Sequence, residues 1–396
     1  MTHRRTILIG SLWLVLLAAL FVSQSMLGRV AAEGGTAVQA PRFEVDPMWP
    51  KPLPNHWILG SAIGVWVDNR DHIWIIHRGA ATLDPNENAL GGKLSKNCCQ
   101  AAPPVLEFDQ AGNLVQGWGG PGQGYEWPDS NHGIFVETNG TVWIAGNGQQ
   151  DGQLLKFTRD GKFLKQFGFG YANAGSTDTF AFRQPAKIFV DEPNKEAYIA
   201  DGYGNHRVVV LDSDTGAFKR VWGAYGNKPD DVNYGRYRPD APPLQQFRNP
   251  VHCADLSVDR LVYVCDRVND RLQVFTPDGK FVKEQFFEKE TLGSGSVWDI
   301  AFSKDPQQKY IFLADGMNQR IEILDRQSLQ LITSFGDGGR QPGEFFGVHS
   351  IAIDSKGNLF TTETWEGKRL QKFSYRGMGS VSSGHQGVRW PGAKSH

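Results

Sequence analysis

Three histidines occupy equivalent positions in a sequence that repeats itself, and histidine is the commonest metal ligand among the side chains. His132, His252 and His349 each lie four residues before the end of a short apolar segment: NHGIFV, VHCADL and VHSIAI. Three histidines with an open fourth position are the ligand set of catalytic zinc. Whether the imidazoles converge depends on the elements that carry them.

Those elements belong to a unit of four short apolar segments that occurs six times. The second segments of the six copies are centred on Trp74, Trp143, Tyr198, Tyr263, Phe312 and Phe360, 48 to 69 residues apart. This spacing predicts an all-β fold, a six-bladed β-propeller, because radial stacking covers the faces of each sheet and a closed ring removes exposed ends. The last copy stops after its third strand, so we expect PRFEVDPMW (residues 41–49) to supply the fourth and close the ring.

The pattern also predicts the boundaries of the chain's parts. Residues 1–32 have a basic start, an apolar run and small residues at the end, which is typical of a signal peptide. We therefore expect a secreted or otherwise extracytoplasmic protein, with a retained membrane anchor as the alternative. Residues 33–54 would carry the ring-closing strand and residues 55–376 the propeller, followed by a mobile Gly/Ser-rich tail at 377–396.

The histidines fall in the second, fourth and sixth copies, and the same position in the other copies holds Ile63, Ala186 and Trp298. The first strand of each blade lines the central channel, and alternate blades of a six-bladed ring are about 120° apart. The three imidazoles are thus expected to meet with threefold geometry. A single histidine at a strand entry is usually just a hydrogen-bonded residue, but three in one repeated position favour a metal, with zinc ahead of copper or iron.

Three further residues are predicted to surround this metal. Tyr203 stands in DGYGNHR, a loop one residue longer than its counterparts DRVNDR and DGMNQR. A metal and an arginine would favour its phenolate, which could then accept a proton. Arg78 and Arg267 lie in loops on the same rim and suggest a substrate with a carboxylate, which guanidinium binds in bidentate fashion. The alternative for each arginine is an ion pair with a loop carboxylate.

Other features set limits on the function. A net charge of −1 gives no reason to expect a nucleic-acid partner, and a membrane is expected only if the N-terminal segment is retained. The long insertions 79–104 and 223–248 are placed to wall a pocket at the channel mouth. The recurrent Arg207, Arg271 and Arg320 are expected to tie strands or blades together. Four cysteines allow three pairings, although Cys253 and Cys265 flank a predicted hairpin turn.

Several motifs resemble known families. The segment YGNHRVVVLD resembles the NHL repeat, and HRG, NHGIFV, DGYGNHR, PVHCADL, CDRVNDR and GVHSIAI, in this order, resemble the lyase domain of peptidylglycine α-amidating enzymes. That family, the peptidyl-α-hydroxyglycine α-amidating lyases, is a six-bladed propeller with a three-histidine zinc site. The resemblance implies cleavage of a peptidyl-α-hydroxyglycine to an amide and glyoxylate. It also implies that His132, His252 and His349 bind zinc, that Tyr203 is the base and that Arg78 and Arg267 belong to the active site.

The chain departs from the family in two places. Ser350 stands where the family has an aspartate associated with structural calcium, and Gly204 stands where it has a cysteine. A calcium site and the family's disulfides are therefore weaker expectations than zinc. Two other functions remain open: a metal-dependent propeller hydrolase or lactonase, which normally needs carboxylate ligands, and a non-catalytic NHL binding scaffold.

Overall fold

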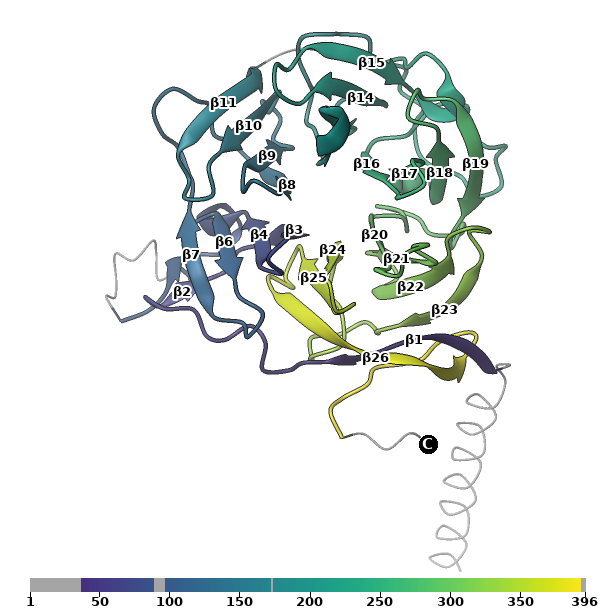
Figure 1. Ribbon diagram of the computed structural model, residues 1–396. Coiled ribbons are helices and arrows are strands. Elements are labelled where there is room, and N and C mark those ends of the chain that lie inside the picture. Colours follow the sequence, from purple (N-terminus) through teal and green to yellow (C-terminus); the bar gives the residue numbers. More distant parts are fainter. Residues whose placement is uncertain (1–36, 89–96, 172–173, 393–396) are drawn as a thin grey trace, which may run out of the picture.

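A computed structural model describes residues 37–88, 97–171 and 174–392. Six four-stranded antiparallel sheets surround a central channel, with the first strand of each sheet innermost (Figure 1). The predicted six-bladed all-β propeller is confirmed. The predicted signal peptide lies outside the described residues, and among those that are described no helix is long and apolar enough to cross a membrane.

The first three blades follow one strand order from the channel outward. Their strands are β3 (Ala62–Val67), β4 (Ile73–His77), β6 (Val105–Phe108) and β7 (Leu114–Trp118); β8 (Asn131–Val136), β9 (Val142–Gly146), β10 (Gln153–Phe157) and β11 (Phe163–Gly168); and β12 (Lys187–Asp191), β13 (Glu196–Asp201), β14 (Arg207–Asp212) and β15 (Phe218–Trp222).

The last three blades repeat the order, and the sixth recruits its outer strand from the N-terminal side. Their strands are β16 (Val251–Leu256), β17 (Val262–Asp266), β18 (Arg271–Phe275) and β19 (Phe281–Phe286); β20 (Asp299–Phe302), β21 (Tyr310–Asp315), β22 (Arg320–Asp325) and β23 (Leu331–Phe335); and β24 (Val348–Ile353), β25 (Leu359–Glu363), β26 (Leu370–Ser382) and β1 (Ala37–Val45).

The remaining short elements lie in the loops between the blade strands. A parallel pair, β2 and β5, stands beside the first blade, and four 3₁₀ turns complete the described secondary structure. Their bounds are β2 (Trp57–Ile58), β5 (Gln100–Ala101), η1 (Gly79–Thr82), η2 (Glu192–Asn194), η3 (Ala224–Gly226) and η4 (Arg267–Asn269).

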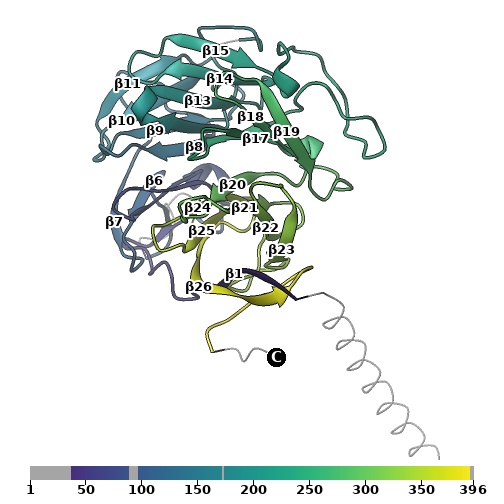
Figure 2. The same ribbon diagram turned by 45° about the vertical axis from the view of Figure 1, so that its right-hand side comes forward.

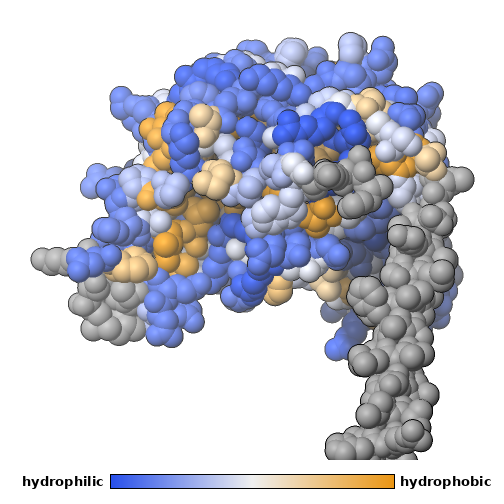
Figure 3. All heavy atoms as spheres, turned by 90° about the horizontal axis from the view of Figure 1, so that it is seen from below, coloured by the Kyte–Doolittle hydropathy of each residue, from blue (hydrophilic) through white to orange (hydrophobic). Residues whose placement is uncertain are grey.

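Burial falls from the channel outward, and this explains the apolar pattern. Every residue of the second strands β4, β9 and β17 is buried, whereas the outer strands β7, β15 and β19 are mostly half-buried or exposed. Neighbouring blades cover both faces of the inner strands, so these strands are continuously hydrophobic. The six aromatic residues that marked the copies are all at most 2% exposed. From below, the surface is largely hydrophilic, with hydrophobic side chains in separate patches (Figure 3).

The repeated Asp…Asn-x-Arg motif closes the loop between the second and third strands of a blade. In the third blade the Arg207 guanidinium donates to Asp201 at 2.8 Å, and Asn205 donates to the same carboxylate at 2.8 Å. Arg271 and Arg320 pair with the equivalent aspartates in the next two blades. The predicted structural role of these arginines is confirmed: each ties two strands together within its own blade.

The ring closes through β1, which pairs antiparallel with β26 from Ala37↔Ser382 to Val45↔Phe373 (Figure 1). The predicted ring-closing strand is confirmed, but the expected tail boundary at Gly377 is corrected. Strand β26 continues to Ser382 because β1 offers it a hydrogen-bonding edge. Beyond it, the backbone of residues 386–389 bonds to Ser334 and Val45.

Candidate metal centre

Each of the three predicted histidines lies at a β-bulge in the innermost strand of its blade. In β16 the pairing with β17 passes from Val251 directly to Cys253, and in β24 it passes from Val348 to Ser350. The register of β8 shifts in the same way between Asn131 and Ile134. A bulge re-aims the unpaired side chain, so His132, His252 and His349 turn into the channel.

The residues in the three positions without histidine orient the imidazoles. The Nδ1 atoms of His132, His252 and His349 lie 2.7, 2.5 and 2.8 Å from the carbonyl oxygens of Ala186, Trp298 and Ile63, respectively. A carbonyl only accepts hydrogen bonds, so Nδ1 carries the proton and Nε2 keeps its lone pair. A backbone carbonyl of each odd-numbered blade thereby fixes the tautomer of the histidine in a neighbouring even-numbered blade.

The three imidazoles are close enough to share one ion. Their ring centroids are 4.8 to 5.0 Å apart, and one ring nitrogen from each lies within 4.8 Å of those from the other two. Burial is the main cause that lowers the pKa of each imidazole well below 6.5, and the positive charge of Arg267 adds to the shift for all three. They are thus neutral at pH 7, which is the form that binds a metal.

Tyr203 lies directly against this triad. Its hydroxyl oxygen is 3.0 Å from His132 Nε2 and 3.1 Å from His252 Nε2. The preceding Gly202 makes this approach possible, since a Cβ there would stand 2.1 Å from the carbonyl oxygen of Val251. The structure therefore places the hydroxyl of Tyr203, the predicted base, beside two of the three candidate ligand nitrogens.

Arg267 donates a hydrogen bond to Tyr203 and has a further N–H group without an acceptor in the part of the chain that the structure describes. Its Nη1 donates to the Tyr203 hydroxyl at 2.9 Å, and its guanidinium lies 4.5 Å from the Trp298 ring centroid. The side chain is buried, yet its Nε has no hydrogen-bond partner among the described residues. A carboxylate bound here would satisfy that donor.

Arg78 is held from the opposite side by the second blade. Its Nη2 donates to Asn147 Oδ1 at 2.9 Å and its Nε donates to the Asn131 carbonyl at 3.3 Å. Burial lowers the pKa of Arg78, while Tyr203 and Asp151 act against that shift. Neither Arg78 nor Arg267 forms an ion pair among the described residues, so the ion-pair alternative does not apply to them.

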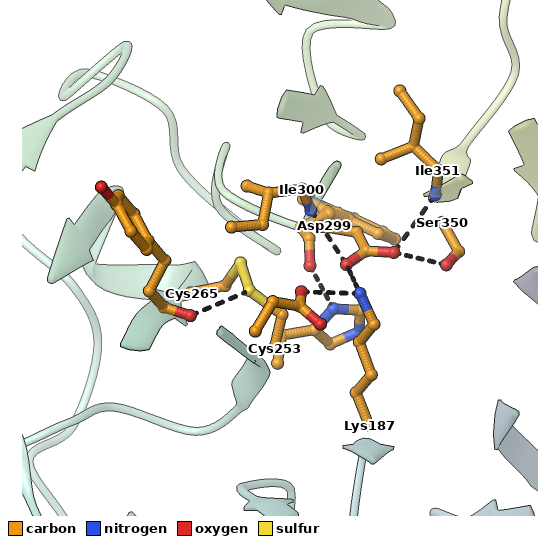
Figure 4. Close-up of a disulfide and its surroundings, with 11 residues drawn as sticks. Lys187, Cys253, Cys265, Asp299, Ile300, Ser350 and Ile351 are labelled. Atoms are coloured by element: carbon orange, nitrogen blue, oxygen red, sulfur yellow. Dashed lines mark hydrogen bonds and ion pairs between the residues drawn. A yellow bond between two sulfur atoms is a disulfide. The ribbon is translucent and has the colours of Figure 1, made fainter. Parts of the chain in front are cut away.

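A buried ammonium lies deeper in the channel. Lys187 Nζ is 2.8 Å from Asp255 and 2.6 Å from Asp299, and the other oxygen of Asp299 accepts from Ser350 and from the backbone of Ile351 (Figure 4). The group thus joins the first strands of blades 3 to 6. Calcium would need these carboxylates as ligands, and Lys187 already pairs with both of them. The residues of this cluster therefore do not fit a calcium ion.

A disulfide anchors one side of the site. Cys253 and Cys265 form it between β16 and β17 (Figure 4), and Cys253 directly follows His252 in the sequence. The sulfur atoms of Cys98 and Cys99 also lie against each other. The disulfide resolves the pairing that the sequence left open.

Comparisons with known proteins agree with this architecture. Mouse NHL repeat-containing protein 3 is 26% identical over 357 residues, covering 85% of each chain. Mouse peptidyl-glycine alpha-amidating monooxygenase is 26% identical over 245 residues, or 58% of this chain. This chain is similar to both. It spans only 22% of the monooxygenase's length, and no family model matches it.

A solved structure supports the fold alone. A structural genomics protein of unknown function from Bacteroides thetaiotaomicron superposes with a TM-score of 0.50 at 14% identity. The match covers 86% of this chain and 77% of that one.

The structure brings all six predicted site residues together. Sequence reasoning missed Trp298, which stacks on Arg267, and the channel lysine Lys187. Both had a signal: Trp298 is a bulky residue in the position that alternates with histidine, and Lys187 is a charge that directly precedes the apolar run IFV. It also missed Asn131 and Asn147, whose contacts with Arg78 join separate blades.

Proposed function

We propose that the protein is an exported zinc-dependent lyase that cleaves the C–N bond of a peptidyl-α-hydroxyglycine-like carbinolamide. The products are an amide and glyoxylate. One observation carries the proposal: three neutral imidazoles present Nε2 to one point, and a tyrosine hydroxyl, itself bonded to an arginine, lies against two of them. The similarity to amidating monooxygenases supports this choice of reaction. The Cys253–Cys265 disulfide suits an oxidising compartment.

The side chains present can carry out each proton movement. Zinc held by His132, His252 and His349 would supply Lewis acidity toward the carbinol oxygen. The oxygen of Tyr203, hydrogen-bonded to Arg267, accepts the hydroxyl proton. As the oxygen forms the C=O bond of glyoxylate, the C–N bond breaks and its electron pair goes to nitrogen, to which Tyr203 returns the proton. Arg267 and Arg78 hold the substrate carboxylate, which becomes that of glyoxylate.

The test is glyoxylate release from α-hydroxyhippurate by the purified full-length protein, together with metal analysis. The wild type should contain about one zinc per chain, the capacity of one three-histidine site. His252→Ala should lose the metal and roughly 100-fold or more of the activity. His56→Ala removes an exposed histidine and should match the wild type. Equal zinc content in wild type and His252→Ala would contradict the metal site.

A non-catalytic scaffold is the second candidate. It is favoured by the similarity to NHL repeat-containing protein 3 over 85% of the chain, because that name describes repeats and no activity. Bound zinc without glyoxylate formation would support it. A hydrolase or lactonase with carboxylate ligands is less well supported, since Asp255 and Asp299 are paired with Lys187.

A further inference from the structure

A second pocket adjoins the candidate site at Arg267. Its volume is about 640 Å³, and its walls come from the insertion 223–248 and from the loop between β19 and β20. The insertion projects from the rim between the third and fourth blades (Figure 2). Arg267 stands between the two sites, because its guanidinium contacts Tyr203 while the residue also lines the pocket. A substrate bound at Tyr203 can therefore extend into this pocket.

The pocket is positively charged. Arg236, Arg248 and Arg267 all line it, and its lining contains no aspartate or glutamate. A smaller cavity of about 160 Å³ shares Arg236 and Arg248 and adds Lys289, again without a carboxylate. The acidic residues Asp230 and Asp231 lie in the same insertion but line neither space.

The arginines differ in how they are held. Arg248 is fixed, because its Nε donates to Asn269 at 3.0 Å and its Nη1 donates to the carbonyl of Tyr234 at 3.2 Å. Arg236 is exposed and makes no hydrogen bond or ion pair within the part of the chain that the structure describes. An unpaired guanidinium beside a rigid one gives a bound anion two charged donors.

Aromatic side chains complete the walls. Tyr234 and Tyr237 line both cavities, and Tyr237 is fixed because its hydroxyl donates to the backbone of Lys289 at 3.0 Å. Flat, half-buried rings of this kind accept planar or extended groups at little entropic cost.

We propose that this pocket holds the acyl part of the substrate and selects acyl groups with a second anionic group, which Arg236 and Arg248 recognise. The inference rests on the proposed lyase function for the orientation of the substrate. The preferred substrate is thus a dianion: one carboxylate lies at the carbinol end beside Arg267 and Arg78, and the other lies at the far end of the acyl group.

The first experiment compares two matched substrates, α-hydroxyhippurate and its 4-carboxybenzoyl analogue, by glyoxylate release from the zinc-loaded full-length protein. The wild type should show at least about a tenfold higher kcat/KM for the carboxylated compound, equivalent to one charged hydrogen bond of about 1.4 kcal/mol. Arg236→Gln should remove most of this preference and leave the kcat/KM of α-hydroxyhippurate unchanged. Arg260→Gln, on the opposite rim of the fourth blade, should behave as the wild type.

A second measurement separates the pocket from the chemistry. Hippurate and 4-carboxyhippurate lack the hydroxyl and are not cleaved, so their binding is measured by calorimetry in wild type and Arg236→Gln. Tighter binding of the dianion that depends on Arg236, without turnover of either substrate, would overturn the lyase proposal and support the pocket. Turnover with no preference in either assay would overturn the pocket and keep the lyase. Equal binding without turnover would overturn both.

Discussion

At the residue scale, the candidate site depends on which nitrogen of each imidazole carries the proton. Carbonyl groups of neighbouring blades hold Nδ1–H, so all three Nε2 lone pairs face the same space. Tyr203 completes the set, because its hydroxyl touches two imidazoles and receives a hydrogen bond from Arg267. This position is the reason why the proposed mechanism assigns the base to Tyr203.

Replacing Tyr203 with phenylalanine tests that role. We expect kcat for α-hydroxyhippurate to fall roughly 10²- to 10⁴-fold, the usual contribution of a general base, while zinc content and folding stay as in the wild type. Glyoxylate kinetics and metal analysis measure the two effects. Tyr171→Phe changes an exposed tyrosine and serves as the control. Activity of Tyr203→Phe within tenfold of the wild type would show that the phenol is not the base.

At the scale of elements, the inner strands position the site through contacts that cross from blade to blade. The bulges turn the histidines into the channel, and Lys187 joins β12 to Asp255 in β16 and Asp299 in β20. Burial raises the pKa of Asp255 to about 6 even though Lys187 opposes the shift. The charge of Asp255 therefore depends on the ammonium.

Lys187→Met should lower the free energy of unfolding by about 3–5 kcal/mol at pH 7, because it leaves two buried carboxylates without a cation. Without the ammonium, the pKa of the Asp255 carboxyl rises further above the ordinary 3.8. The folded variant then takes up protons between pH 7 and pH 5 that the unfolded chain does not bind. The deficit should thus shrink as the pH falls. Urea unfolding at both pH values measures it.

Two controls accompany that measurement. Lys195→Met removes an exposed lysine that pairs with Asp214 and should change stability little. Calcium and a calcium chelator should both leave the melting temperature of the wild type unchanged. A calcium-dependent rise in the wild type would contradict the conclusion that Lys187 takes the place of the ion.

At the scale of the whole molecule, a propeller is stable only when the last blade meets the first. Strand β1 completes the sixth sheet, and its residue Phe43 packs in the hydrophobic core. Its ring centroid lies 5.3 Å from Phe312 and 5.2 Å from Phe335, both in the fifth blade. One buried ring thus joins the N-terminal strand, the sixth sheet and the fifth sheet.

Phe43→Ala should therefore cost about 3–5 kcal/mol of unfolding free energy, as expected for a large cavity in a packed core. Glu44→Gln, in the same strand, alters only a partly exposed pair with Arg376 and should cost little. Denaturant unfolding of both variants compares them. A similar loss in the two would mean that β1 contributes its backbone pairing and not its buried ring.

The amino-acid sequence by itself determined the repeat, the six blades, the need for a closing strand and the equivalent positions of the histidines. These follow from local hydrophobic periodicity, which can be read from a single sequence. Only the tertiary structure decided the bulges, the carbonyl partners of the imidazoles, the channel lysine and the pairing of residues 377–382. Apart from the bulges, each of these features joins segments that are at least 46 residues apart in the sequence. A bulge depends on strand register, and a shift of one residue turns a side chain from the channel to the opposite face of the strand. The hydrophobic pattern of the sequence does not fix the register to one residue, whereas the pairing of the strands in the closed ring does.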